Sequence, residues 1–174
     1  MRLLIALLFV ALASPALAQY WTHYDNARFG YGIDIPPGFE GDGESDNGDG
    51  QSFHNLSRAQ GLVVWGGLLT ADFETEVQAA LAAAGANAWT VTEQTTTPQW
   101  AHFSAIKGQR LLHQRMMLLC EAAGYAAFRI EYPVTDTAEM QGVIQGLTRS
   151  FAASGCQAGD VKTSGAESSN PHRP

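Results

Sequence analysis

Positively charged residues are scarce in this sequence of 174 residues. Ten Lys and Arg stand against 17 Asp and Glu, only Lys107 and Lys162 are lysines, and the formal net charge is −7 at pH 7. Nucleic acids and anionic membrane surfaces bind proteins through basic patches. We therefore expect neither nucleic acid nor a membrane surface as a partner.

Long apolar runs are also missing, except near the N-terminus. Arg2 precedes the unbroken apolar run Leu3–Leu12, and the small-residue pattern Ala16-Leu17-Ala18 follows it. This is the pattern of a secretory signal peptide that is cleaved before Gln19. The run is shorter than the about 18 residues that a membrane-spanning helix needs. The sequence therefore predicts a signal peptide over 1–18, a periplasmic or secreted protein, and no membrane insertion after cleavage.

Cysteine is rare as well. The chain has Cys120 and Cys156 and no Cys-x-x-Cys pair. In the oxidising compartment that export implies, two thiols usually form a structural disulfide. The bond would close a loop of 36 residues, from 120 to 156, which the chain-entropy model values at about 3–4 kcal/mol. We therefore predict a Cys120–Cys156 disulfide.

Two segments have helical periodicity. In 72–84, apolar residues recur every four positions and Gly85 is a natural C-terminal cap. In 136–151, Asp136 and Glu139 form a cap pair ahead of one apolar stripe. Strands are expected at 20–24, 29–35, around 53, and at 62–65, 89–93, 99–106, 109–120 and 125–132.

This order of elements predicts one α+β domain. Strand-rich blocks separated by two helices favour a central, mainly antiparallel β-sheet flanked by α-helices. The domain is expected to cover 19–156. Only one aliphatic residue, Val161, follows it, so 157–174 is expected to be a disordered tail.

Several short motifs occur in a familiar order. They are Tyr24-Asp25-Asn26-Ala27-Arg28-Phe29-Gly30-Tyr31 with Ile33-Asp34-Ile35-Pro36, then Asn47-Gly48-Asp49-Gly50, Leu62-Val63-Val64-Trp65-Gly66, Tyr132-Pro133 and Arg149-Ser150-Phe151. This order resembles the PsbP-like superfamily, which also includes a Ran-binding factor of nuclear transport, and within it an exported bacterial branch. The resemblance implies a central antiparallel sheet between helices, forming a PsbP-like sandwich. It also implies binding or accessory roles rather than a shared catalysis.

An acidic, Gly-rich segment, 40–51, suggests a calcium loop. Asp42, Glu44 and Asp46 supply carboxylates at alternate positions, which calcium prefers. However, Asn47 occupies the sixth position and Phe53 the twelfth, where a calcium loop needs Gly and Glu. The alternative is a solvated loop whose glycines allow tight turns, and the sequence favours it.

The register of two hairpins decides which polar side chains share a sheet face. A loop over 122–124 with Gly124 left-handed would pair residue 121 with 125, and a turn at 107–108 would pair Ile106 with Gln109. One face would then carry Trp100, His102, Ser104, His113, Arg115, Arg129 and Glu131.

We consider three interpretations of this face. His102, His113 and Glu131 are a zinc-type ligand set. Alternatively, Arg115 stacked on Trp100 and held by Glu131, with Arg129 beside it, would orient an anionic ligand. The third interpretation is an ordinary sheet face with a cross-strand ion pair, and the sequence favours it.

Hydrolytic chemistry has weak support. Ser104 near His102 and Ser57 near His54 suggest nucleophile–base pairs, but no orienting acid is assigned to either. No nucleophile elbow, phosphate loop or zincin motif is present in the sequence. We therefore expect a non-catalytic accessory or ligand-binding protein of the cell envelope, whose partner is an envelope protein or a small ligand. The alternative is a metal-binding protein or metalloenzyme.

Overall fold

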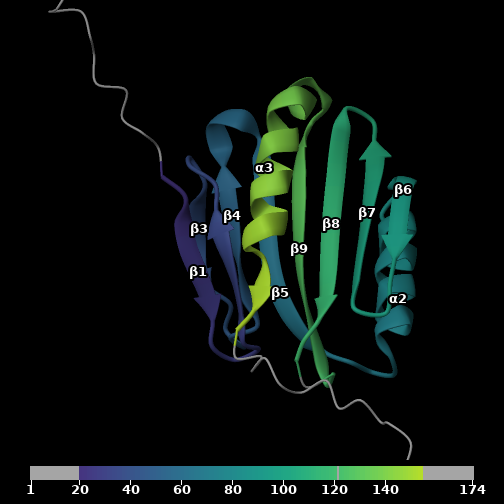
Figure 1. The fold of residues 1–174 in the computed structure, drawn as a ribbon. Coiled ribbons are helices and arrows are strands. Elements are labelled where there is room, and N and C mark those ends of the chain that lie inside the picture. The colour runs from purple at the N-terminus through teal and green to yellow at the C-terminus, as the bar shows by residue number, and fades with distance from the viewer. Residues whose placement is uncertain (1–19, 121, 155–174) are drawn as a thin grey trace, which may run out of the picture.

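The computed structural model describes residues 20–120 and 122–154, drawn in Figure 1. Its elements are β1 (Thr22–Asn26), β2 (Tyr31–Ile35), β3 (Glu40–Glu44), β4 (Gly50–Asn55), the 3-10 helix η1 (Leu56–Arg58), β5 (Gln60–Leu68), α2 (Phe73–Ala86), β6 (Thr90–Thr96), β7 (Trp100–Lys107), β8 (Arg110–Leu118), β9 (Gly124–Pro133), the 3-10 helix η2 (Val134–Asp136), α3 (Thr137–Ser150) and β10 (Ala152–Ala153). A seven-stranded sheet has the order β3-β4-β5-β9-β8-β7-β6, and a smaller sheet has the order β1-β2-β10. All strand pairs are antiparallel.

The large sheet has helices on both faces (Figure 1). On the face that we name the α3 face, Leu62, Phe128 and Ile130 pack against the small sheet and α3. On the opposite α2 face, Met116 and Phe103 belong to clusters that α2 covers. The fold is therefore α+β, with a central antiparallel sheet between helices as the sequence predicts.

Helix α2 begins where the sequence predicts. The Asp72 carboxylate accepts a hydrogen bond from the Thr75 backbone N–H at 2.7 Å, which caps the helix. The predicted cap at Gly85 is wrong, because the helix continues through it to Ala86. Asn87 is the C-cap residue, and the left-handed conformation after the helix is taken by Ala88, with a φ of +63°.

Helix α3 buries the predicted stripe, since Met140 and Leu147 are fully buried in the core. The predicted cap pair is wrong. Asp136 makes no side-chain capping bond; its Oδ2 accepts from the Gln60 amide at 2.7 Å, while Glu139 pairs with Arg58. Both acids thus join α3 to the segment around η1 instead of capping their own helix.

Most of the segment expected as an acidic loop is a hairpin. β3 and β4 pair across 40–54, so the connection between them is only 45–49. Within it, Asp49 Oδ1 accepts from the Ser45 hydroxyl at 2.6 Å, and Asp49 Oδ2 accepts from the Asn47 amide at 2.8 Å. Of the glycines in this segment, Gly48 lies in the turn with a φ of +68°, while Gly41, Gly43 and Gly50 lie in the strands.

Three predictions lie outside the described residues. They concern the signal peptide over 1–18, the tail over 157–174, and Cys156 as the disulfide partner of Cys120. They stay predictions. Within residues 20–120 and 122–154, no helix is long and apolar enough to cross a membrane.

Candidate functional site

The β7–β8 hairpin differs from the expected register by two residues. Lys107 pairs with Arg110, whereas the sequence suggested Ile106 with Gln109. An even shift leaves every side chain on its expected face. His102 and His113 therefore share the α3 face, where Ser104 lies directly opposite His113.

The β8–β9 register predicted from the sequence is wrong. Leu118 pairs with Tyr125, which is a shift of three residues and therefore inverts the faces. The cause is the loop, in which Ala122 rather than Gly124 has a positive φ, +52°. The Leu119 N–H bonds to the Gly124 carbonyl at 2.9 Å, so the loop is longer than expected.

The inversion separates the proposed zinc ligands. Glu131 is level with Leu112 on the α2 face, whereas His113 is level with Ile130 on the α3 face. Among the described residues, no three His, Cys, Asp or Glu side chains form a group that could hold a metal. The structure therefore does not bring His102, His113 and Glu131 together.

The α3-face residues form a row of flat rings across three strands. Trp100 and His102 lie 5.8 Å apart between ring centroids at 4°, His102 and His113 lie 5.7 Å apart at 29°, and His113 and Phe128 lie 6.1 Å apart at 39°. The Arg115 guanidinium lies 4.8 Å from the Trp100 ring centre. The expected stacking of Arg115 on Trp100 is present, but Glu131 does not hold it.

His113 is neutral at physiological pH. Burial, with smaller electrostatic contributions from His102 and Arg115, lowers the pKa of its imidazole from 6.5 to about 4. Its Nδ1 lies 3.2 Å from the Ser104 hydroxyl oxygen. A general base works best with a pKa near the working pH, so this histidine is a poor base for activating Ser104.

The other suggested pairs are also not formed. Ser104 contacts His113 and not the expected His102. The Ser57 hydroxyl donates to Asn55 at 2.9 Å, while His54 Nε2 pairs with Asp42 at 2.8 Å.

The three carboxylates suggested for calcium do not converge either. Asp42 turns to His54, as described above. The Glu44 carboxylate accepts from the Tyr24 hydroxyl at 2.9 Å and from the Asn26 amide at 2.8 Å. Among residues 20–120 and 122–154, these carboxylates therefore form no group that could hold a metal ion.

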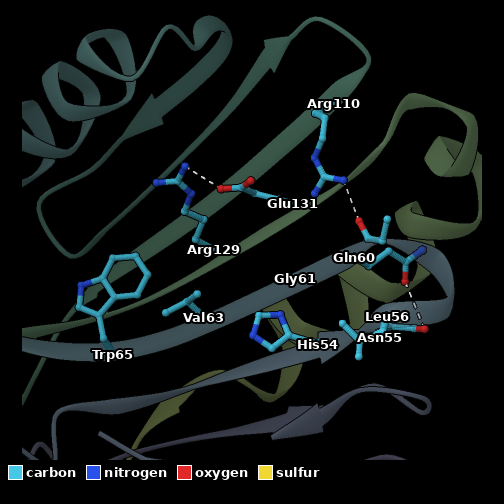
Figure 2. A pocket seen from close by; sticks show the side chains of 11 residues that line it. His54, Asn55, Leu56, Gln60, Gly61, Val63, Trp65, Arg110, Arg129 and Glu131 are labelled. Atoms are coloured by element: carbon cyan, nitrogen blue, oxygen red, sulfur yellow. Dashed lines mark hydrogen bonds and ion pairs between the residues drawn. The ribbon is translucent and has the colours of Figure 1, made fainter. Parts of the chain in front are cut away.

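A groove that the sequence does not predict lies on the α2 face of the large sheet. Helix α2 contacts β6 and β7, and the α2 face over β4, β5 and β9 is hollowed by a groove of about 850 Å³. We name it the β5 groove (Figure 2). It is lined by His54, Asn55, Leu56, Ala59, Gln60, Gly61, Val63, Trp65, Arg110, Arg129 and Glu131.

Strand β5 forms the floor of the groove by alternation. Gly61, Val63 and Trp65 face it, while Leu62 and Val64 are fully buried on the α3 face. Val63 remains 38% exposed. The sequence predicts a strand at 62–65, but a continuous apolar run does not reveal which of its side chains face outward.

Two of the residues singled out from the sequence, Arg129 and Glu131, lie in this groove. Arg129 Nη2 and Glu131 Oε1 form an ion pair at 2.7 Å. The Arg129 guanidinium also lies 5.8 Å from the ring centre of Trp89. The Nε atom of Arg129 is buried and has no hydrogen-bond partner in the described part of the chain.

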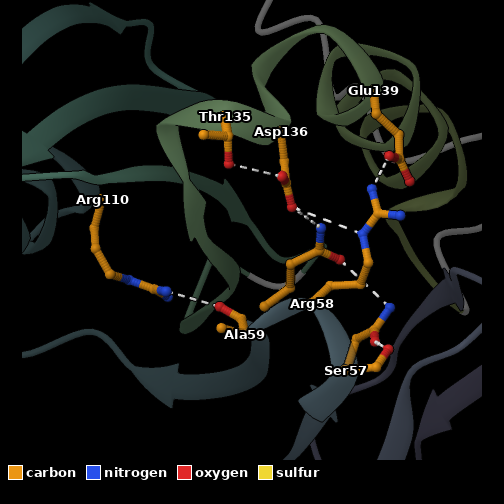
Figure 3. Close-up of polar contacts among 9 residues, drawn as sticks. Ser57, Arg58, Ala59, Arg110, Thr135, Asp136 and Glu139 are labelled. Carbon is orange, nitrogen blue, oxygen red and sulfur yellow. Dashed lines mark hydrogen bonds and ion pairs between the residues drawn. The ribbon is translucent and has the colours of Figure 1, made fainter.

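Polar contacts join the η1 end of the groove to β8, η2 and α3 (Figure 3). Arg110 Nη1 donates to the Ala59 carbonyl at 2.7 Å, and the Gln60 amide donates to Asp136 at 2.7 Å. Arg58 pairs with Glu139 on α3. These contacts fix the wall of the groove before any ligand arrives, which lowers the entropy cost of binding.

Comparisons with known proteins identify the fold. No family model matches the sequence, and no curated protein matches it. The solution structure of cyanobacterial PsbP (CyanoP) from Synechocystis sp. PCC 6803 has a TM-score of 0.61 and 12% identity, covering 81% of this chain and 96% of that one. The Ran-binding protein Mog1p of Saccharomyces cerevisiae has a TM-score of 0.58 and 10% identity, covering 78% of this chain and 96% of that one. At such identities the likeness shows the fold alone: this chain has a PsbP-like fold.

Proposed function

We propose that the protein is a non-catalytic binding protein of the cell envelope, periplasmic or secreted, and that the β5 groove is its binding site. The groove carries this proposal. Ligand sites are typically concave, mostly apolar, about 300–1,000 Å³ in volume and furnished with a few polar groups. A groove of about 850 Å³ with Val63 and Trp65 on its floor and Arg110 and Arg129 beside them fits that description.

The polar groups of the groove are arranged for ligand recognition rather than for catalysis. Arg129 is held by Glu131, and Arg110 is held by the Ala59 carbonyl. Groups fixed in this way orient a ligand without having to reorganise. The proposed location rests on the N-terminal pattern over 1–18. That Mog1p is a Ran-binding protein supports a binding role through the shared fold, without indicating the ligand.

A neutral apolar probe tests the proposal. N-phenyl-1-naphthylamine fluoresces when it enters an apolar site, and we expect saturable binding to the native protein. Val63→Glu places a charge on the groove floor and should weaken binding about tenfold or more, because an apolar probe would have to strip water from that carboxylate. Leu56→Glu should also weaken binding of the probe. Because the Leu56 side chain lines the groove from η1 and is 86% exposed, this substitution carries little risk to folding.

A matched control comes from the same strand. Leu68 is also an apolar residue of β5, is 70% exposed and does not line the groove. Leu68→Glu should therefore bind the probe as the native protein does, and thermal melts check that all three variants fold. Equal binding by the Val63 and Leu68 variants would contradict the site. Turnover of a generic ester, phosphate or peptide substrate that one point variant abolishes would contradict the non-catalytic role.

A further inference from the structure

We infer that the β5 groove takes an elongated carboxylate, an apolar chain that ends in a single negative charge, with the carboxylate at Arg110 and the chain extending towards Trp65. This inference rests on the proposed function and adds the class of ligand. Three features of the groove carry it: the available charge, the length, and the position of the apolar side chains.

The two arginines of the groove differ in how much of their charge is compensated. Arg129 is paired with the Glu131 carboxylate. Within the described residues, the one hydrogen bond of the Arg110 guanidinium goes to the neutral Ala59 carbonyl. A guanidinium presents five N–H donors in a planar fork that suits a carboxylate. Arg110 is therefore the group that an anionic ligand would meet.

One uncompensated cation favours one negative charge. The whole chain carries a net charge of −7, so a multiply charged ligand such as a phosphate ester would be repelled by the surrounding field. A single carboxylate satisfies Arg110 and adds the least repulsion. The Arg129–Glu131 ion pair is neutral overall, so it adds no net positive charge for a second anionic group.

The length of the groove follows from the strand registers. Arg110 is level with Pro133 of β9, and Trp65 is level with Ala127. Six residues separate those two positions on β9, which is about 20 Å at 3.3–3.4 Å per residue. Figure 2 shows Arg110 and Trp65 at opposite ends of the groove, with Val63 between them. An extended chain fits this shape better than a compact ring system does.

The apolar side chains continue away from Arg110 along this line. Val63 lies on the floor between Arg110 and Trp65 and is 38% exposed, while Leu56 stands at the η1 end and is 86% exposed. Trp65 packs into the cluster beneath α2 while still lining the groove. A ligand chain would cover these surfaces and remove them from water, which is favourable by roughly 25 cal/mol per Å² of apolar area.

A matched pair of probes tests the inference. 11-(Dansylamino)undecanoic acid is an extended fluorescent carboxylate, and its methyl ester has the same chain without the charge. We expect the native protein to bind the acid about tenfold or more tightly than the ester, because a charge-assisted hydrogen bond is lost in the ester. Arg110→Gln should remove this preference by weakening the acid alone, and Arg110→Lys should keep most of it.

Arg149→Gln is the control, because Arg149 is an exposed arginine of α3 outside the groove; it should keep the full preference. If the native protein binds the ester as tightly as the acid, or if Arg110→Gln leaves the preference intact, the carboxylate inference is wrong. The proposed function survives that result provided that Val63→Glu still weakens the binding of both the acid and its methyl ester. If the native protein binds neither these probes nor N-phenyl-1-naphthylamine, both the proposed function and the inference are wrong.

Discussion

At the scale of single residues, burial decides the chemistry of the α3 face. His113 looks like a candidate base because it lies 3.2 Å from the Ser104 hydroxyl. Burial instead lowers its pKa to about 4, so the imidazole is neutral and serves as a packed ring between His102 and Phe128. The same neutrality makes the stability of the fold depend on pH.

We predict that His113 destabilises the protein as the pH falls from about 6.5 to about 4. In this range the unfolded chain binds a proton at His113 and the folded chain does not, since its pKa is depressed from 6.5 to about 4. The free energy of unfolding therefore falls with falling pH, by up to about 3 kcal/mol. Below pH 4 both states are protonated and this contribution changes no further.

Denaturant unfolding of the native protein, His113→Phe and Ser104→Ala at several pH values between 7 and 4 measures the effect. His113→Phe should lose this part of the pH dependence. Ser104→Ala should keep it, because burial and not the hydroxyl lowers the pKa. A His113→Phe variant with the same pH slope as the native protein would show that the imidazole is not held neutral.

At the scale of elements, two glycines in different environments should respond oppositely to alanine. Gly142 lies in α3, and a Cβ there would meet no atom within 4 Å. Gly50 begins β4, and a Cβ there would lie 1.9 Å from the Val64 carbonyl oxygen of β5. Gly142→Ala should stabilise the protein by about 0.5–1 kcal/mol through helix propensity.

Gly50→Ala should destabilise it by about 3 kcal/mol, because the β4 and β5 backbones must separate. Thermal and denaturant unfolding of the two variants beside the native protein measures both signs. Equal effects of the two substitutions would mean that β4 and β5 are not packed as closely as the structure shows.

The two helices and most strands were predictable from the sequence, whereas β3 and the register between β8 and β9 were not. The apolar stripe of α3 and the strands β1 and β2 follow directly from the periodicity of apolar residues. The β8–β9 register depends on which loop residue is left-handed, and Ala122 takes that conformation although Gly124 is the expected choice. That one choice moved Arg129 and Glu131 to the other face.

At the scale of the whole molecule, uneven coverage of the sheet creates the groove. Helix α2 contacts β6 and β7, while the same face over β5 and β9 is hollowed instead of filled. Sequence reasoning could not find this hollow, because it depends on where a helix lies across a sheet. Only the assembled fold brings Arg110, from the start of β8, beside η1 and β5.

NMR mapping of the bound probe would show whether the β5 groove is the binding site. We would titrate ¹⁵N-labelled protein with 11-(dansylamino)undecanoic acid and follow the amide chemical shifts. We expect the changes to concentrate in η1, in β5 around Val63, at the start of β8 at Arg110, and in β9 from Arg129 to Pro133. Changes concentrated instead around His102 and His113 on the α3 face, or no changes at saturating probe, would contradict it.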